Sequence, residues 1–143
     1  MEKSVEKLIF IKDFSKNPGP RYINQGKSSG EDYYLRVLNK EFTDAYEKKY
    51  KLIVNLDGVD GYMSSFLDEA FGNLVYDFGI DNVTELLSVV SNEEPEWIDM
   101  IENDTYVEWQ KRRDKNDPPK RTNSFSEWSQ LNEGKIVTIK IDR

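Results

Sequence analysis

The chain has 143 residues, a net charge of −7 and neither cysteine nor histidine. Without these two residue types it cannot form disulfides, thiolate metal sites, or the Ser-His-Asp and Cys-His arrangements of common hydrolases. The acidic balance argues against direct nucleic-acid binding and favours a basic protein surface as a partner. The length suits a single domain.

The N-terminal part is expected to alternate strands with helices. A short apolar run at 8–11 predicts a first strand. A turn-rich stretch follows, with a short strand expected at 21–24. Ser29 and Asp32 form a capping pair that predicts the start of a helix. Apolar residues then recur at helical spacing as far as Tyr46.

The segment from Lys51 to Leu74 predicts a buried strand, a Gly-rich turn and a second helix. Residues 52–56 are nearly all apolar, as in a central strand that is buried on both faces. Ser64 and Ser65 are expected to cap the helix, because serine is a preferred residue at that position. The apolar positions of this helix define one face that is expected to enter the core.

The C-terminal part predicts a strand, a helix, a linker and a last strand. The strand is expected at 86–90, and the helix begins near Pro95 and is lined by tryptophans. Pro118-Pro119 among charged residues predicts the linker, and the last strand is expected at 136–141. This alternation predicts an α/β fold with a mixed or largely parallel sheet and helices packed against it.

Several carboxylates lie near the end of the central strand, where sites often form in α/β sheets. Asp57, Asp60, Asp68 and Glu69 could bind Mg²⁺ or act as acid and base. The simpler interpretation is a solvated acidic surface at a helix start, with Glu69 held by Arg21 in a structural ion pair. The sequence therefore predicts no catalytic residue, no metal and no cofactor.

Several short motifs are separated along the chain: Gly19-Pro20-Arg21-Tyr22, Gln25-Gly26, Ser29-Gly30-Glu31, Leu56-Asp57-Gly58 and 64–72. Together they resemble the STAS-like family of unknown function (the DUF4325 type) and, more distantly, anti-sigma factor antagonists. The resemblance covers about residues 5 to 105. It implies a STAS-like domain at 1–105 and a C-terminal helix and strand extension at 106–143 that packs on the same domain.

The resemblance also implies a function. In antagonists of this class, a serine kinase with a GHKL-type ATPase fold phosphorylates a serine at a helix start. Carried over, Ser64 is the first phosphorylation candidate and Ser65 the second. The implied protein is a non-catalytic regulatory module that binds a protein partner, and the resemblance suggests such an ATPase or kinase as that partner. The partner-binding candidates are Asp57, Asp60, Tyr62, Met63, Glu69 and Arg21.

An alternative function follows from small size, acidity and the lack of catalytic residue types. The chain could be a phage-encoded anti-defence inhibitor that occupies a nucleic-acid cleft on a host enzyme. The N-terminus lacks the apolar core of a signal peptide, and no apolar run is long enough to span a membrane. A cytoplasmic location is therefore expected.

Overall fold

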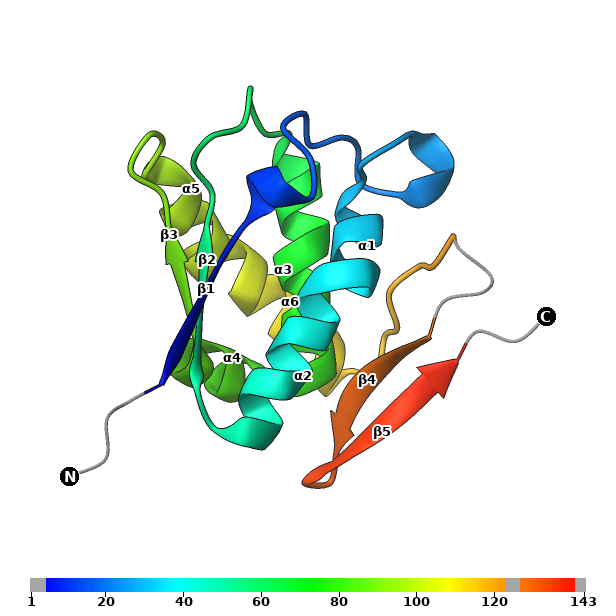
Figure 1. The fold of residues 1–143 in the computed structure, drawn as a ribbon. Coiled ribbons are helices and arrows are strands. Elements are labelled where there is room, and N and C mark those ends of the chain that lie inside the picture. The colour runs from blue at the N-terminus through cyan, green and yellow to red at the C-terminus, as the bar shows by residue number, and fades with distance from the viewer. Residues whose placement is uncertain (1–4, 123–126, 141–143) are drawn as a thin grey trace.

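The computed structural model describes residues 5–122 and 127–140. A layer of helices separates a three-stranded sheet from a two-stranded hairpin (Figure 1). In chain order, the helices and strands are β1 (Glu6–Phe10), α1 (Gly30–Tyr33), α2 (Asn39–Lys48), β2 (Lys51–Asn55), α3 (Ser64–Phe78), α4 (Ile80–Leu86), β3 (Leu87–Val90), α5 (Glu96–Asp99), α6 (Tyr106–Asp114), β4 (Glu127–Asn132) and β5 (Lys135–Lys140).

Short turns of other helical types connect some of these elements. Two 3₁₀ turns, Ile11–Asp13 and Ile23–Gln25, lie between β1 and α1. A π-helical turn, Tyr34–Leu38, joins α1 to α2, and a second, Met100–Thr105, joins α5 to α6. Each pair therefore forms one continuous helical stretch. The short strand predicted at 21–24 is wrong, because the side chain of Gln25 accepts a hydrogen bond from the backbone of Tyr22 and closes a turn there.

The main sheet is wholly parallel, with β2 between β1 and β3. Leu52 and Val54 of β2 are buried against the helices, together with Leu87 and Val89 of the neighbouring strand. Residues on the opposite face of the sheet are less covered: Ile53 is half-buried and Leu8 is exposed. The prediction of a central strand is confirmed, whereas its expected burial on both faces is wrong.

The first long helical stretch begins where the sequence predicts. The hydroxyl of Ser29 accepts a hydrogen bond from the backbone N–H of Asp32 at 3.0 Å, so it satisfies one of the free donors of the first turn. Of the residues predicted to line its apolar face, Tyr46 is half-buried, and the others are buried: Tyr34, Leu35, Leu38, Phe42 and Ala45.

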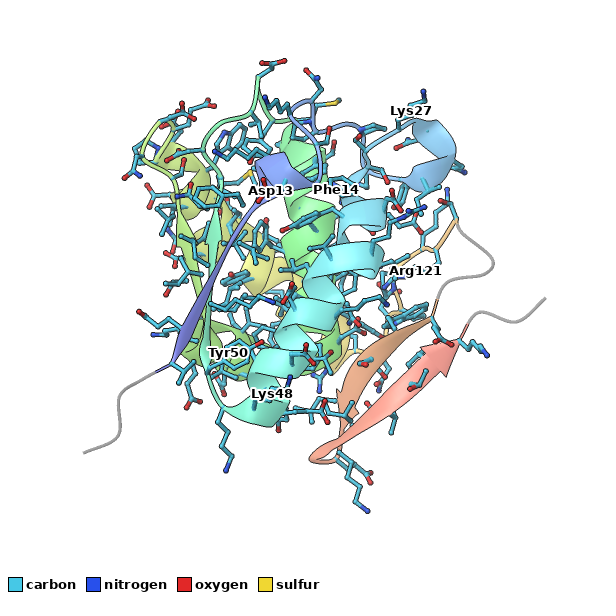
Figure 2. All side chains as sticks on the ribbon, viewed as in Figure 1. Asp13, Phe14, Lys27, Lys48, Tyr50 and Arg121 are labelled. Atoms are coloured by element: carbon cyan, nitrogen blue, oxygen red, sulfur yellow. The ribbon has the colours of Figure 1, made fainter. Side chains whose placement is uncertain are left out.

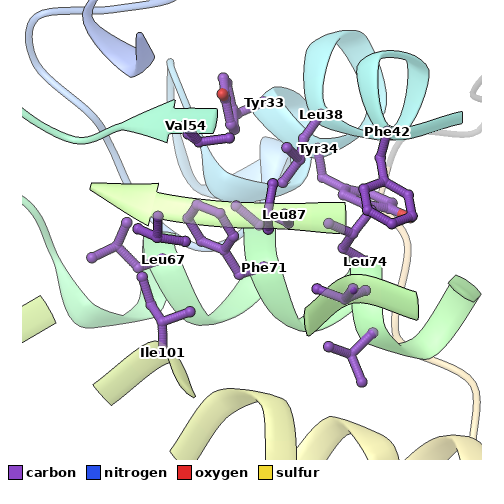
Figure 3. Packing of buried hydrophobic residues seen from close by; sticks show 14 of the residues in the cluster. Tyr33, Tyr34, Leu38, Phe42, Val54, Leu67, Phe71, Leu74, Leu87 and Ile101 are labelled. Atoms are coloured by element: carbon purple, nitrogen blue, oxygen red, sulfur yellow. The ribbon is translucent and has the colours of Figure 1, made fainter. Parts of the chain in front are cut away.

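Helix α3 is the centre of the core (Figure 3). All seven apolar positions predicted for its inner face are fully buried: Phe66, Leu67, Ala70, Phe71, Leu74, Val75 and Phe78. The close-up shows Leu67, Phe71 and Leu74 of α3 in one cluster with Leu87 of β3 and with side chains of the first helical stretch, among them Leu38 and Phe42. Gly79 ends the helix with a φ of 85°, a backbone angle that glycine adopts without strain.

The last helical stretch packs closely on α3. The indole of Trp109 on α6 lies directly against Gly72, where a methyl group would overlap the ring. Trp109 is buried and Trp97 is half-buried, as expected for tryptophans that line this helix. Helix α4, between α3 and the predicted strand at β3, was not expected from the sequence.

The C-terminal strands form a separate antiparallel hairpin on the far side of the helices. The last strand was predicted, but it pairs with β4, which was not predicted, and not with the main sheet. The expected linker around Pro118-Pro119 is irregular, and Asn123 and Ile141 lie outside the described residues. The fold is α/β with helices packed against a parallel sheet, as predicted. Across the two described ranges, we find no helix long and apolar enough to cross a membrane.

Candidate functional site

The carboxyl ends of the three parallel strands meet at one edge of the main sheet. The loop from Leu56 to Met63 leaves β2 at this edge and leads into α3, beside the loops that follow β1 and β3 (Figure 1). Ligands and partners of α/β proteins often bind at this end of the sheet. We refer to residues 56–63 as the edge loop.

Asp57 ties the edge loop to the loop after β3. Its carboxylate accepts hydrogen bonds from the backbone N–H groups of Asn92 and Glu93, at 2.9 and 3.0 Å, and from the Asn92 side chain. These bonds hold the pKa of Asp57 below its usual value, with the Glu93 backbone as the main cause. Asp57 thus positions the neighbouring loop.

The middle of the edge loop is held from two sides. The backbone N–H of Gly58 donates to the carboxylate of Glu93 at 2.7 Å, and the side chain of Lys12 lies against the other side of this glycine. The backbone N–H of Asp60 donates to the carbonyl of Lys16 at 2.8 Å. The loops after β1 and β3 therefore both restrain the edge loop, while the side chain of Asp60 is exposed.

Tyr62 closes the edge loop. Its hydroxyl donates to the carbonyl of Leu56 at 2.6 Å, and its ring packs against Phe66 and Trp97. Burial raises the pKa of Tyr62, so its hydroxyl stays protonated at neutral pH. The next residue, Met63, is 53% exposed. A large apolar side chain is thus presented to solvent by a loop with little freedom to move.

The prediction that Ser64 or Ser65 caps α3 is wrong. Met63 occupies the N-cap position with extended backbone angles, and no side chain caps this helix end. Because the extended residue is Met63, the two serines fall on the first two helical positions. Ser64 is exposed and Ser65 is half-buried. Within the described residues, neither hydroxyl forms a hydrogen bond with another side chain or with the backbone.

Arg21 and Glu69 form the ion pair that the sequence predicted. The Nη1 atom of Arg21 lies 3.1 Å from Oε1 of Glu69 and 2.8 Å from Oδ2 of Asp68. Glu69 is 1% exposed, and its second oxygen accepts a hydrogen bond from Asn73. Burial raises the pKa of Glu69, although the bonds from Asn73 and Arg21 oppose this effect. Asp68 is further held by the hydroxyl of Thr105.

The carboxylates considered for metal or acid-base chemistry are not gathered in one place. Asp57 binds the backbone at 92–93, Asp60 is exposed, and Glu69 is buried beside Arg21. Among residues 5–122 and 127–140, no group of three or more carboxylates is placed to hold a metal ion.

A second polar cluster was missed by the sequence reasoning. Asp77 on α3 is 1% exposed, and its carboxylate accepts hydrogen bonds from the hydroxyl of Tyr34 and from the side chain of Gln130 on β4. Asn39 donates to the same tyrosine hydroxyl at 2.9 Å. Burial raises the pKa of Asp77 to about 6. The signal was the spacing of Glu69, Asn73 and Asp77, because residues four apart on a helix share one face.

The parallel sheet, the helices packed on it and the edge loop before α3 form an α/β domain that is consistent with a STAS-like fold. Residues 36–97 match the family described as "STAS-like domain of unknown function (DUF4325)". The match runs from the first helical stretch through the edge loop and β3 to the start of α5, and it confirms the predicted resemblance over these residues. Searches of curated proteins and of solved structures found no match. A STAS-like domain suggests a regulatory or binding module.

Proposed function

We propose that this chain is a STAS-like regulatory module that binds a protein partner through the edge loop. The observation that supports the proposal is the exposure of Met63 on a restrained backbone. A binding surface that is already ordered loses little conformational entropy when a partner docks. Methionine adapts well to apolar pockets on partners, because its side chain is unbranched and polarizable.

The charges around Met63 indicate the chemistry of the partner. Asp60 on the edge loop and three glutamates after β3, at 93, 94 and 96, are all exposed. Two lysines, Lys12 and Lys16, lie on the other side of the loop. Acidic side chains around an apolar residue suit a partner with an apolar pocket and a basic rim, since complementary charges speed association and select the partner.

We further propose that phosphorylation of Ser64 controls this binding. The serine is exposed at the first position of a helix of 15 residues, where the helix dipole favours negative charge. A phosphate there would lie next to Met63 and add charge to an acidic surface. An apolar partner pocket that fits Met63 and an uncharged serine would exclude the charged phosphate, so its contact with Met63 would be lost. The resemblance suggests a GHKL-type kinase or ATPase as that partner.

The test of the binding surface uses wild-type protein and two variants as bait in extracts of the native host. Met63→Glu places a charge on the edge loop, and Val107→Glu is the matched control, because Val107 is an exposed apolar residue on α6. We expect one or more proteins to be retained by wild type and Val107→Glu but lost with Met63→Glu. Equal retention by all three baits would reject this surface.

The phosphorylation step has its own test. Any kinase retained in that experiment is incubated with ATP and the protein, and intact mass is measured. We expect one added phosphate on wild type and Ser65→Ala, and none on Ser64→Ala. An unmodified wild-type protein would reject the switch and leave the binding surface intact.

The alternative, an acidic inhibitor of a host nucleic-acid enzyme, would use the same acidic edge of the sheet. It makes a different prediction for the retained partner. An inhibited enzyme would release its nucleic acid when the protein is added, and the Met63→Glu variant would fail to compete. A partner that is a GHKL-type ATPase without a nucleic-acid substrate favours the regulatory module.

A further inference from the structure

A cavity of about 430 Å³ lies at the opposite end of α3 from the edge loop. Its walls are formed by Tyr76 and Asp77 of α3, by Pro119 and Arg121 of the segment before the hairpin, and by the hairpin itself. Cavities that bind small molecules have roughly this size. Ser64 and Asp77 are the two ends of the helix, about 20 Å apart at the rise of an α-helix, so this cavity is separate from the proposed protein-binding surface.

Arg121 gives the cavity buried hydrogen-bond donors that have no partner among the described residues. Its guanidinium stacks on the ring of Trp128, 4.5 Å from the ring centre, and lies between the helices and the hairpin (Figure 2). Its Nη1 atom donates to the carbonyl of Lys120 at 3.3 Å. The other two nitrogens, Nε and Nη2, are buried and have no hydrogen-bond partner among the described residues.

The two unpartnered nitrogens are on the same edge of the guanidinium. Their N–H groups point in parallel and form a fork, and this fork matches the spacing of two oxygens of a carboxylate or phosphate. A buried donor without a partner is costly to a folded protein. An anion with two oxygens on this edge would satisfy both donors of Arg121 at once.

The buried carboxylate of Asp77, which also lines the cavity, does not satisfy these two donors of Arg121. Both oxygens of Asp77 accept hydrogen bonds, from Tyr34 and from Gln130. Among the described residues, Arg121 and Asp77 are not within the 4 Å of an ion pair. The cavity therefore offers free donors, while the acceptors of its buried acid are in use. Such a site selects a ligand that brings acceptors, which means an oxyanion and not a cation.

The remaining walls indicate the rest of the ligand. Trp128, Pro118, Pro119 and Ile139 give the cavity an apolar side. We propose that this cavity binds a small organic oxyanion, with its carboxylate or phosphate on the Nε and Nη2 edge of Arg121 and its apolar part against Trp128 and the two prolines. Such a ligand contacts both α3 and the hairpin, and it holds the two together.

The test is a titration followed by NMR, with benzoate and phenyl phosphate as probes and uncharged benzamide as the control ligand. We expect benzoate, phenyl phosphate or both to shift the indole N–H signal of Trp128 and the side-chain amide of Gln130. Benzamide should leave both signals unchanged at the same concentration. If only one of the two probes binds, the result supports the proposal and identifies the preferred ligand as a carboxylate or as a phosphate. Binding of neither, at millimolar concentration, overturns the proposal.

Variants test the role of the fork. Arg121→Lys keeps the positive charge but lacks the two parallel donors, and we expect it to weaken binding by about tenfold or more. Arg36→Lys is the matched control, because Arg36 is exposed on the first helical stretch, and it should bind as wild type does. Wild-type affinity in a folded Arg121→Lys protein would overturn the proposal. If that variant does not fold, Pro119→Asp is used in its place. It puts a negative charge in the cavity wall and must weaken the binding of the probe.

Discussion

The guanidinium of Arg21, from the loop before α1, contacts the carboxylate of Glu69 on α3 across 3.1 Å. Glu69 is almost completely buried, whereas Arg21 keeps part of its side chain in solvent. The pair joins two segments that are 48 residues apart in the chain. Removal of Arg21 would leave the buried carboxylate with one hydrogen-bonding side chain, Asn73, and without the charge of its ion-pair partner.

We expect Arg21→Met to lower the free energy of unfolding by about 2 kcal/mol, less than the 3–5 typical of a fully buried pair, because Arg21 is partly exposed. Arg36→Met removes an exposed pair with Asp32 and should cost about 0.5 kcal/mol or less. Urea denaturation measures both. The double variant Arg21→Met with Glu69→Gln should regain part of the loss, and an Arg21→Met protein as stable as wild type would contradict the prediction.

Gly72→Ala should be strongly destabilising. A methyl group at this position would overlap the indole of Trp109, and the two helices would have to move apart. Overpacking of a core costs about 1–3 kcal/mol. Gly61→Ala is the control, because nothing lies within 4 Å of an added methyl group there. Thermal unfolding should show a clearly lower Tm for Gly72→Ala and little change for Gly61→Ala. Similar Tm values for the two variants would mean that α6 does not pack on α3 as described.

Asp77 should make stability depend on pH. Burial raises its pKa from 3.8 to about 6 in the folded protein. The folded state therefore holds a proton that the unfolded state releases in this interval, and stability falls as the pH rises from about 4 to about 6. The full cost is present above pH 6 and amounts to about 3 kcal/mol.

Asp77→Asn removes this titration. As the pH rises from about 4 to about 7, the free energy of unfolding of the variant should increase by about 3 kcal/mol relative to that of wild type. Urea denaturation at several pH values measures the difference. Parallel curves for the two proteins over this range would show that Asp77 titrates as an ordinary exposed acid does.

Asp57→Ala should loosen the loop after β3 without unfolding the protein. The carboxylate binds the backbone N–H groups of Asn92 and Glu93, so both should exchange with solvent faster in the variant. The pKa of Asp57 in the folded protein is lower than its ordinary value. The stabilisation from these bonds is therefore complete at a pH above the ordinary pKa, and it is lost as the pH falls through the lowered pKa.

The global cost of Asp57→Ala should be small, below about 1 kcal/mol, because the carboxylate is close to solvent. Asp60→Ala is the control, since Asp60 is an exposed acid on the same loop. Hydrogen exchange of residues 92 and 93 is the measurement. Unchanged exchange in Asp57→Ala, or equal changes in both variants, would contradict a positioning role for Asp57.

Features with a local cause could be predicted from the sequence. The cap at Ser29 and the buried face of α3 depend on residues a few positions apart, and both are present as expected. The family resemblance was visible for the same reason, because its motifs are short. The start of α3 was misjudged by one position, because both serines are good caps and only the path of the loop places Met63 there.

Features that depend on distant partners could not be predicted. Strand β4 has few apolar residues, and its pairing with β5 gives it a regular structure. The cluster around Asp77 joins residues from the first helical stretch, α3 and β4, which are 43 and 53 positions apart. The spacing along α3 signalled buried polar residues, but the identity of their partners follows from the docking of the hairpin.

The parallel pairing of the main sheet has a consequence for the order in which the chain folds. Leu8 pairs with Ile53, and Ile53 pairs with Ser88, so each pairing must close a long loop before it gains a hydrogen bond. The β4–β5 hairpin needs only a short turn at 133–134. We therefore expect the helices and the hairpin to form early, and the main sheet to assemble in the slow, rate-limiting step.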